Sequence, residues 1–193
     1  MQQTTNIKER IILGIDPGTS IMGYGLIKET GSKIELISLG VVKMDKIDDH
    51  MLKLQRIFAK TVALIDNYKP DCLAIEAPFY GKNIQVMLKL GRAQGVAMAA
   101  ALSRDVEVTE YAPRKIKMAI TGNGNATKEQ VSAMMQRLLN FTETPEFLDA
   151  TDGLAVAVCH SFQKVSVAKG GGAKKSYSGW DTFVKDNTKR IVK

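Results

Sequence analysis

One segment sets the architecture of the chain: Ile11-Ile-Leu-Gly-Ile-Asp16-Pro-Gly-Thr-Ser20. A continuous aliphatic run that ends at turn residues is typical of a strand buried on both faces, at the centre of a sheet. Such a strand holds Asp16 rigidly at its end, where a carboxylate is unfavourable unless it meets a cation or a hydrogen-bond donor. This segment alone leaves two interpretations open. Asp16 belongs to a metal or phosphate site, or it caps the turn at Pro17-Gly18.

The composition excludes several classes of protein. The chain has 193 residues, of which 45% are hydrophobic, enough for one domain and an appendage. Charged residues interrupt every apolar run before it reaches membrane-spanning length, and residues 1–10 lack the apolar core of a secretion signal. Cys72 and Cys159 lie in apolar patterns typical of reduced core thiols rather than of a disulfide framework. We therefore expect a cytoplasmic protein that does not bind a membrane.

The net charge of +7 is unevenly distributed. Residues 164–193 contain eight basic and two acidic side chains, a net charge of +6, which leaves 19 basic and 18 acidic side chains, or +1, for the rest. A basic balance indicates a polyanionic partner, although most of this charge lies outside the predicted fold. We divide the chain into a domain, 1–165, and a basic, flexible tail, 166–193. Solvated disorder is the favoured interpretation of the tail; the alternatives are contact with nucleic acid and docking of a partner through Trp180 and Phe183.

The hydrophobic periodicity predicts a mixed α/β fold with a five-stranded sheet flanked by helices. Strands are expected at 11–16, 22–28, 33–44, 73–76 and 106–111. Helices are expected from Asp48 or Asp49 to Pro70, at 83–103, from Pro113, from Thr127 and at 147–164. Thr127 and Gln130 form a capping-box pattern at the fourth of these helices. The first helix is expected to bury Met51, Leu54, Phe58, Val62 and Ile65.

Two of the predicted strands end in a carboxylate followed by a proline. The strand at 73–76 ends at Glu76 and is preceded by a helix long enough for a crossover, so it should lie parallel to the first strand. If the two strands are neighbours, their carboxyl ends meet at the edge where ligands bind in open α/β sheets. Asp16 and Glu76 would then face each other.

A third acidic element is Asp149-Ala-Thr-Asp152. Carboxylates three residues apart on a helix share one face and repel each other unless a cation lies between them. The alternative is that both acids stabilise the first turn of their helix through its dipole. Convergence of all four carboxylates would suit hard divalent cations, and two Mg²⁺ ions about 4 Å apart can cleave a phosphodiester to a 5′-phosphate and a 3′-hydroxyl. We predict that Asp16, Glu76, Asp149 and Asp152 are catalytic metal ligands for two Mg²⁺ ions, with Mn²⁺ as a substitute.

Other motifs contribute less to the prediction. His160 lies eleven residues beyond Asp149, about 16 Å along a straight helix, which is too far for the two to share a metal. The loop at 121–125 is a turn signal, and the helix start after it could hold a phosphate with the help of Lys128. The alternative interpretation is that Lys128 is a solvated surface lysine. The sequence contains no zinc-ligand spacing, Walker A pattern or GxSxG elbow.

The acids belong to longer motifs, which follow one another in the chain. They are Ile12-Leu-Gly-Ile-Asp-Pro-Gly-Thr19 with Gly23-Tyr-Gly25; Ala74-Ile-Glu76 with Phe79 and Lys82-Asn83; Leu88-Lys-Leu-Gly91 with Gly95-Val96; Tyr111-Ala112 with Lys117; and Asp149-Ala-Thr-Asp152-Gly-Leu-Ala155. From about Ile11 to His160, they resemble the RuvC family of Holliday-junction resolvases. The resemblance implies an RNase H-like fold and a homodimer. It also implies Mg²⁺-dependent, symmetric nicking of four-way junction DNA in recombination and repair, in cooperation with a branch-migration helicase complex.

The resemblance also implies roles for single residues. The four predicted ligands match the family's metal-binding acids, and Lys117 and Lys128 match basic residues that contact DNA near the cleavage site. Phe79 matches an aromatic residue that contacts bases at the junction, where stacking is worth about 1–3 kcal/mol per base. A core or interface position is the alternative for Phe79. We add Lys82 and Arg114 to the predicted DNA contacts.

The sequence departs from the family pattern around Phe79, which lies between Pro78 and Tyr80, with Gly81 next. The shape of this loop and the preferred cleavage sequence are therefore not implied. Three competing functions remain: an RNase H-like nuclease of structured RNA, a junction-binding module without catalysis, and a phosphate loop of the sugar-kinase or actin type. The intact set of four acids argues against the second, and the short chain argues against the third.

Overall fold

The computed structural model describes residues 9–79, 81, 83–142 and 145–169. This part of the chain forms the strands β1 (Glu9–Asp16), β2 (Ile21–Thr30), β3 (Lys33–Lys43), β4 (Cys72–Glu76) and β5 (Glu107–Tyr111). Its helices are α1 (His50–Tyr68), α2 (Ile84–Leu102), α3 (Pro113–Thr121), α4 (Lys128–Leu139) and α5 (Asp149–Lys169). The mixed α/β fold with five strands is thereby confirmed. None of the helices in the described ranges is both long enough and apolar enough to cross a membrane.

The sheet has the strand order β3-β2-β1-β4-β5, with β1 at its centre. β1 pairs antiparallel with β2 and parallel with β4, as the crossover argument predicts. In the parallel pair Ile15 lies opposite Ile75, so Asp16 and Glu76 follow at the same edge of the sheet. The predicted juxtaposition of these two strand ends is confirmed.

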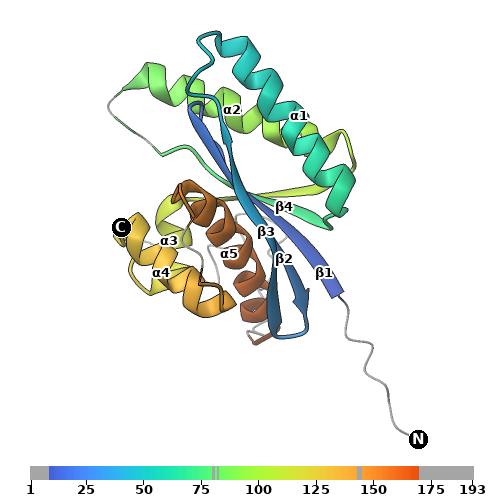
Figure 1. Ribbon diagram of the computed structural model, residues 1–193. Coiled ribbons are helices and arrows are strands. Elements are labelled where there is room, and N and C mark those ends of the chain that lie inside the picture. The colour runs from blue at the N-terminus through green and yellow to red at the C-terminus, as the bar shows by residue number, and fades with distance from the viewer. Residues whose placement is uncertain (1–8, 80, 82, 143–144, 170–193) are drawn as a thin grey trace, which may run out of the picture.

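Helices cover both faces of the sheet (Figure 1): α1 and α2 pack on one face, and α3, α4 and α5 on the other. The alternation of side chains along β1 divides it between two cores. Ile12 joins the core under α5, whereas Leu13 and Ile15 join the core under α1 and α2. Asp16 therefore belongs to the face that carries α5.

Glycines allow α5 to lie directly on the backbone of the sheet. A Cβ at Gly23 would overlap the carbonyl oxygen of Asp149, and a Cβ at Gly14 would overlap that of Gly153. This close approach fixes the height of the first turn of α5 above β1 and β2. The glycines in the motifs at 12–19 and 23–25 therefore have a packing role that brings α5 to the end of β1.

The helix ends follow their capping signals. Asp49 accepts hydrogen bonds from the backbone amides of Met51 and Leu52 and starts α1, and Asn83 caps α2. The predicted capping box of Thr127 and Gln130 is present at α4. α5 continues to Lys169, and the predicted tail beyond residue 169, with Trp180 and Phe183, lies outside the described residues. The division at residue 165 stays a prediction.

The predicted apolar face of α1 was partly wrong. Met51 and Phe58 are 60% and 41% exposed, while Ile57 and Thr61 are buried. Thr61 can replace an apolar residue because its hydroxyl donates to the carbonyl oxygen of Ile57 at 2.8 Å, inside the helix. The helix is therefore turned about its axis relative to the prediction.

Candidate active site

Asp16 and Glu76 lie at adjacent strand ends and face α5. Ile12 and Gly14 precede Asp16 on the α5 side of β1, and Cys72 and Ala74 precede Glu76 on the same side of β4. Both residues are half-buried, and β1 and β4 are interior strands of the sheet. The fold thus holds two half-buried acids side by side.

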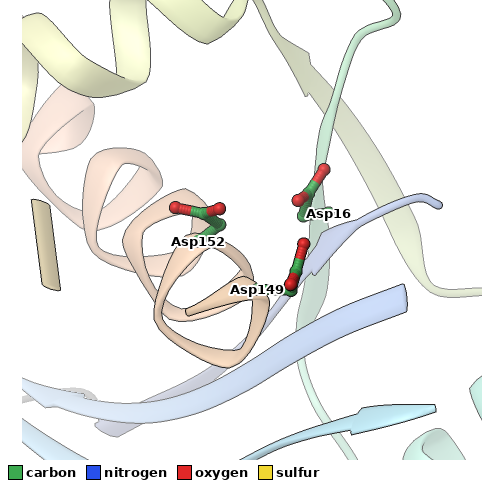
Figure 2. Close-up of side chains that lie close together, drawn as sticks. All are labelled: Asp16, Asp149 and Asp152. Atoms are coloured by element: carbon green, nitrogen blue, oxygen red, sulfur yellow. The ribbon is translucent and has the colours of Figure 1, made fainter. Parts of the chain in front are cut away.

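The first turn of α5 adds two more carboxylates. The amides of Thr151 and Asp152 donate to the carbonyl oxygen of Leu148, which starts the helix at Asp149. Carboxylate oxygens of Asp16, Asp149 and Asp152 all lie within 4.8 Å of one another. Figure 2 shows these three side chains grouped at the first turn of α5. Glu76 lies outside this group of three but lines the same cleft.

Burial and mutual repulsion make Asp16, Glu76 and Asp152 weaker acids than usual. Burial first, and then the charge of Asp152, raises the pKa of Asp16 to about 7. Burial, together with the charges of Asp16 and Asp152, raises the pKa of Glu76 to about 8. Burial also raises the pKa of Asp152, against the opposing effect of Lys128. Holding these carboxylates in their ionised form therefore lowers the stability of the folded state.

Lys128 is the cation that the structure brings to this cluster. Its Nζ lies 2.6 Å from Oδ2 of Asp152 and 3.1 Å from Oδ1 of Asp149. Burial acts to lower the pKa of Lys128, but its hydrogen bonds and ion pairs with these two acids raise it above its ordinary value. One ammonium group cannot neutralise four carboxylates. The remaining negative charge and the hard oxygen donors fit a divalent cation.

The acids open into a cleft of about 370 Å³. Phe79, which is 71% exposed, stands at its rim, and Lys117 lines it together with Lys128. Apolar side chains complete the wall: Pro17, Ile21, Leu90, Pro113, Ile116 and Val131. The cleft therefore combines acids, two cations and an exposed aromatic ring, a combination suited to a phosphodiester and its neighbouring base.

Some predicted residues lie apart from the cleft. Arg114 is exposed on α3 and packs beside Gly124, where an added Cβ would lie 2.6 Å from Arg114 Cγ. Lys82 lies outside the described residues. His160 is buried, with Nδ1 2.9 Å from the Tyr111 hydroxyl and Nε2 3.4 Å from Cys72 Sγ, so its exclusion from the acidic cluster is confirmed.

Sequence reasoning missed two contacts that shape the site. The first is the direct ion pairing of Lys128 with Asp149 and Asp152. It was missed because these residues are 21 or more positions apart in the sequence. The second is the buried Gln94, which donates to Oε2 of Glu110 at 2.7 Å and approaches the carbonyl oxygen of Glu76 at 3.4 Å. A glutamine within the small-residue face of α2 was a weak signal for such a contact.

Comparison with known proteins agrees with these observations. Residues 12–160 match the family described as "Crossover junction endodeoxyribonuclease RuvC". The protein of that name from Christiangramia forsetii is 62% identical over 183 residues, which cover 95% of this chain and 93% of that protein. The protein of the same name from Bacteroides fragilis is 57% identical, with 96% and 97% covered.

Solved structures extend the match to three dimensions. The structure of Thermus thermophilus RuvC in complex with Holliday junction substrate has a TM-score of 0.75 and 30% identity, and covers 82% of this chain and 96% of that one. The yeast mitochondrial Holliday junction resolvase Ydc2, at 13% identity and a TM-score of 0.61, shares the fold. The RNase H-like fold is confirmed. By sequence and structure, the chain belongs to the RuvC family of crossover junction endodeoxyribonucleases.

Proposed function

We propose that the protein is a structure-selective DNA endonuclease that resolves four-way (Holliday) junctions by symmetric, metal-dependent phosphodiester hydrolysis. The observation that carries this proposal is the convergence of Asp16, Glu76, Asp149 and Asp152 on one cleft. A module that only bound DNA would bind it better without four carboxylates, because they repel phosphate. Membership of the RuvC family supports the choice of a DNA junction as substrate.

The four acids are the proposed ligands of Mg²⁺, with two ions per site and Mn²⁺ as a substitute. Support comes from three oxygens within 4.8 Å of one another and from the raised pKa values of Asp16 and Glu76. Such ions, when bound, stabilise the negative charge that develops on the attacked phosphate. Binding them requires Asp16 and Glu76 to lose their protons and Lys128 to give up its contacts with Asp149 and Asp152.

The remaining cleft residues position the DNA. Lys117 and Lys128 contact phosphates beside the cleavage site, and Phe79 stacks on a base unpaired at the junction. The exposure of the Phe79 ring supports this role over a core position. Arg114, outside the cleft, and Lys82 contact the flanking backbone.

The symmetric reaction calls for a homodimer, because one protomer has one acidic cleft and two opposed cuts are needed. α2 is the proposed contribution to the interface. A Cβ at Gly91 or Gly95 would meet nothing within 4 Å, so this face of the helix is open to a partner. Ile84, Val86 and Leu88 on the same helix are exposed apolar side chains.

Two further assignments rest on the family. A branch-migration helicase complex is the proposed partner on the junction, since resolution acts where the arms are being exchanged. The cytoplasm is the proposed location, and Cys72 and Cys159, which are buried and form no disulfide, suit a reducing compartment.

One cleavage assay tests the function. Full-length protein is incubated with a labelled mobile four-way DNA junction, a linear duplex of the same sequence and a structured RNA, each with Mg²⁺, Mn²⁺ or a chelator. Paired nicks at symmetric positions in the junction alone, dependent on metal, are expected. Glu107→Gln, an exposed acid on β5, serves as the control for loss of a carboxylate.

Each alternative has its own outcome in this assay. Cleavage of the RNA in preference to the junction would replace the proposal with an RNA nuclease. Tight junction binding without any metal-dependent nick would replace it with a binding module. Single, unpaired nicks would retain the nuclease but contradict the dimer.

A further inference from the structure

A second groove carries a concentration of positive charge at the edge of the sheet. It has a volume of about 560 Å³ and lies between the end of β3 and the middle of α1. We name it the edge groove; its lining is Val41, Val42, Lys43, Arg56, Ala59 and Lys60. All its charged lining residues are cations, whereas residues 1–163 carry a net charge of only +1.

The cations on α1 form a stripe that is unfavourable for the helix alone. Lys53, Arg56 and Lys60 follow at spacings of three and four, so they share one face of α1. The helix contains no acidic residue before Asp66. Like charges at these spacings repel, and a cation near the start of a helix opposes its dipole. An anionic partner would relieve this repulsion.

Aromatic rings hold two of the cations at the groove. The Nζ of Lys60 lies 5.0 Å from the centroid of the Tyr24 ring, which occupies the space left by Gly40 on the adjacent strand. The Nζ of Lys43 lies 4.1 Å from the centroid of Phe147 and 3.1 Å from Oε1 of Glu146, so its charge is already paired. The cation–π contact of Lys60 keeps its ammonium group ordered without removing its charge.

Arg56 is the cation of the edge groove that is available for a ligand. It is exposed, and within the described ranges it makes no hydrogen bond or ion pair. A guanidinium group offers a planar set of donors that matches a phosphate oxygen pair. Lys60 and Arg56 are four residues apart and present their charges together.

The edge groove opens at the same end of the sheet as the acidic cleft. Asp16 pairs with Gly23, which in turn pairs with Val41, so the groove begins level with Asp16 and two strands away. The groove and the cleft lie on opposite faces of the sheet, because α1 and α5 pack on opposite faces. A DNA strand that reaches both therefore passes around the β3 edge.

We propose that the edge groove binds the sugar-phosphate backbone of a junction arm whose cleaved strand lies in the acidic cleft. This inference rests on the proposed function, because it takes junction DNA as the ligand of the cleft. Arg56 and Lys60 are the principal phosphate contacts, and they set the path of the arm without reading its bases.

The test measures junction binding by the full-length protein in chelator over a series of salt concentrations. Loss of one phosphate contact lowers the slope of log K against log salt by about one, so Arg56→Ala/Lys60→Ala should lower it by about two and weaken binding at every salt concentration. The control is Lys33→Ala/Lys69→Ala, which removes two charges at the far ends of β3 and α1. It should leave the slope unchanged.

Arg56→Glu alone keeps the test decisive if loss of the Lys60–Tyr24 contact disturbs folding, since Arg56 is exposed and unpaired within the described ranges. It should weaken junction binding more than Arg56→Ala does. Equal slopes for the wild type and both double variants, in a protein that binds and cuts junctions, would overturn this inference alone. A wild type that neither binds nor cuts junctions would overturn the proposed function and this inference with it.

Discussion

Two polar clusters lie between the sheet and α5, and they differ in how their groups are satisfied. At the start of the helix, carboxylate oxygens of Asp16, Asp149 and Asp152 lie within 4.8 Å of one another. The ammonium group of Lys128 forms ion pairs with the last two of these acids. Three turns further along, the buried His160 bonds to the Tyr111 hydroxyl and contacts Cys72.

The difference separates stability from function on one helix. A buried polar group whose partners are all protein atoms contributes to folding and gains nothing from solvent. The pKa of Asp16 is raised to about 7 because the protein does not supply enough positive charge to stabilise its ionised form. A bound metal cation would supply that charge. The comparison predicts that changes to the acidic cluster act on activity and changes to the His160 cluster act on stability.

The largest expected effect is that of Asp16→Asn. Loss of a charged ligand removes several kcal/mol of transition-state stabilisation, so junction cleavage should fall by about 10³-fold or more. Junction binding should remain, because the cations and Phe79 are unchanged. Cleavage rate and binding affinity are measured on the same junction. Equal loss of both would indicate that Asp16 is needed for the fold instead.

Gly23→Ala should affect both stability and activity. The new Cβ would overlap the carbonyl oxygen of Asp149, so the first turn of α5 must move away from β2. Overpacking of this kind costs about 1–3 kcal/mol of unfolding free energy. Cleavage by the folded protein should also fall, since Asp149 and Asp152 move with the helix. A change in stability without any change in cleavage would contradict the coupling.

The acidic cluster was predictable from sequence because its signals are local. An aliphatic run, a carboxylate and a proline mark the ends of β1 and β4, and the crossover rule brings Asp16 beside Glu76. Contacts between distant segments were not predictable in this way. Gln94 is buried because Glu110 lies across from it, and tertiary packing decides that partner. Thr61 finds its partner inside its own helix, but the way in which α1 packs on the sheet decides that this face is the buried one.

The pH dependence of metal-free protein should distinguish the two clusters. The pKa is raised to about 7 for Asp16 and to about 8 for Glu76, so between about pH 4 and pH 8 the folded state keeps protons that the unfolded chain has lost. The free energy of unfolding therefore falls as pH rises through this window and is constant above it. A decrease in Tm across this window is expected from these groups.

Added Mg²⁺ should reverse this trend, because the cation takes the place of the protons. The rise in Tm on adding Mg²⁺ should be small at pH 5.5 and larger at pH 8.5, as followed by calorimetry. The variant Asp16→Asn/Glu76→Gln should show a flatter pH dependence and little response to Mg²⁺. An equal rise in Tm at both pH values would contradict protonation of the cluster in the metal-free state.

The smallest expected effect belongs to the His160 cluster. Tyr111→Phe removes the hydroxyl that bonds to Nδ1 of His160 at 2.9 Å, and a buried hydrogen bond contributes about 1 kcal/mol to stability. The free energy of unfolding, measured with urea, should decrease by about that amount. Junction cleavage by the folded variant should match the wild type, because the acidic cluster and its cations are untouched. If cleavage fell while stability did not, the His160 cluster would be part of the active site. The assignment of activity to one end of α5 and stability to the other would then be wrong.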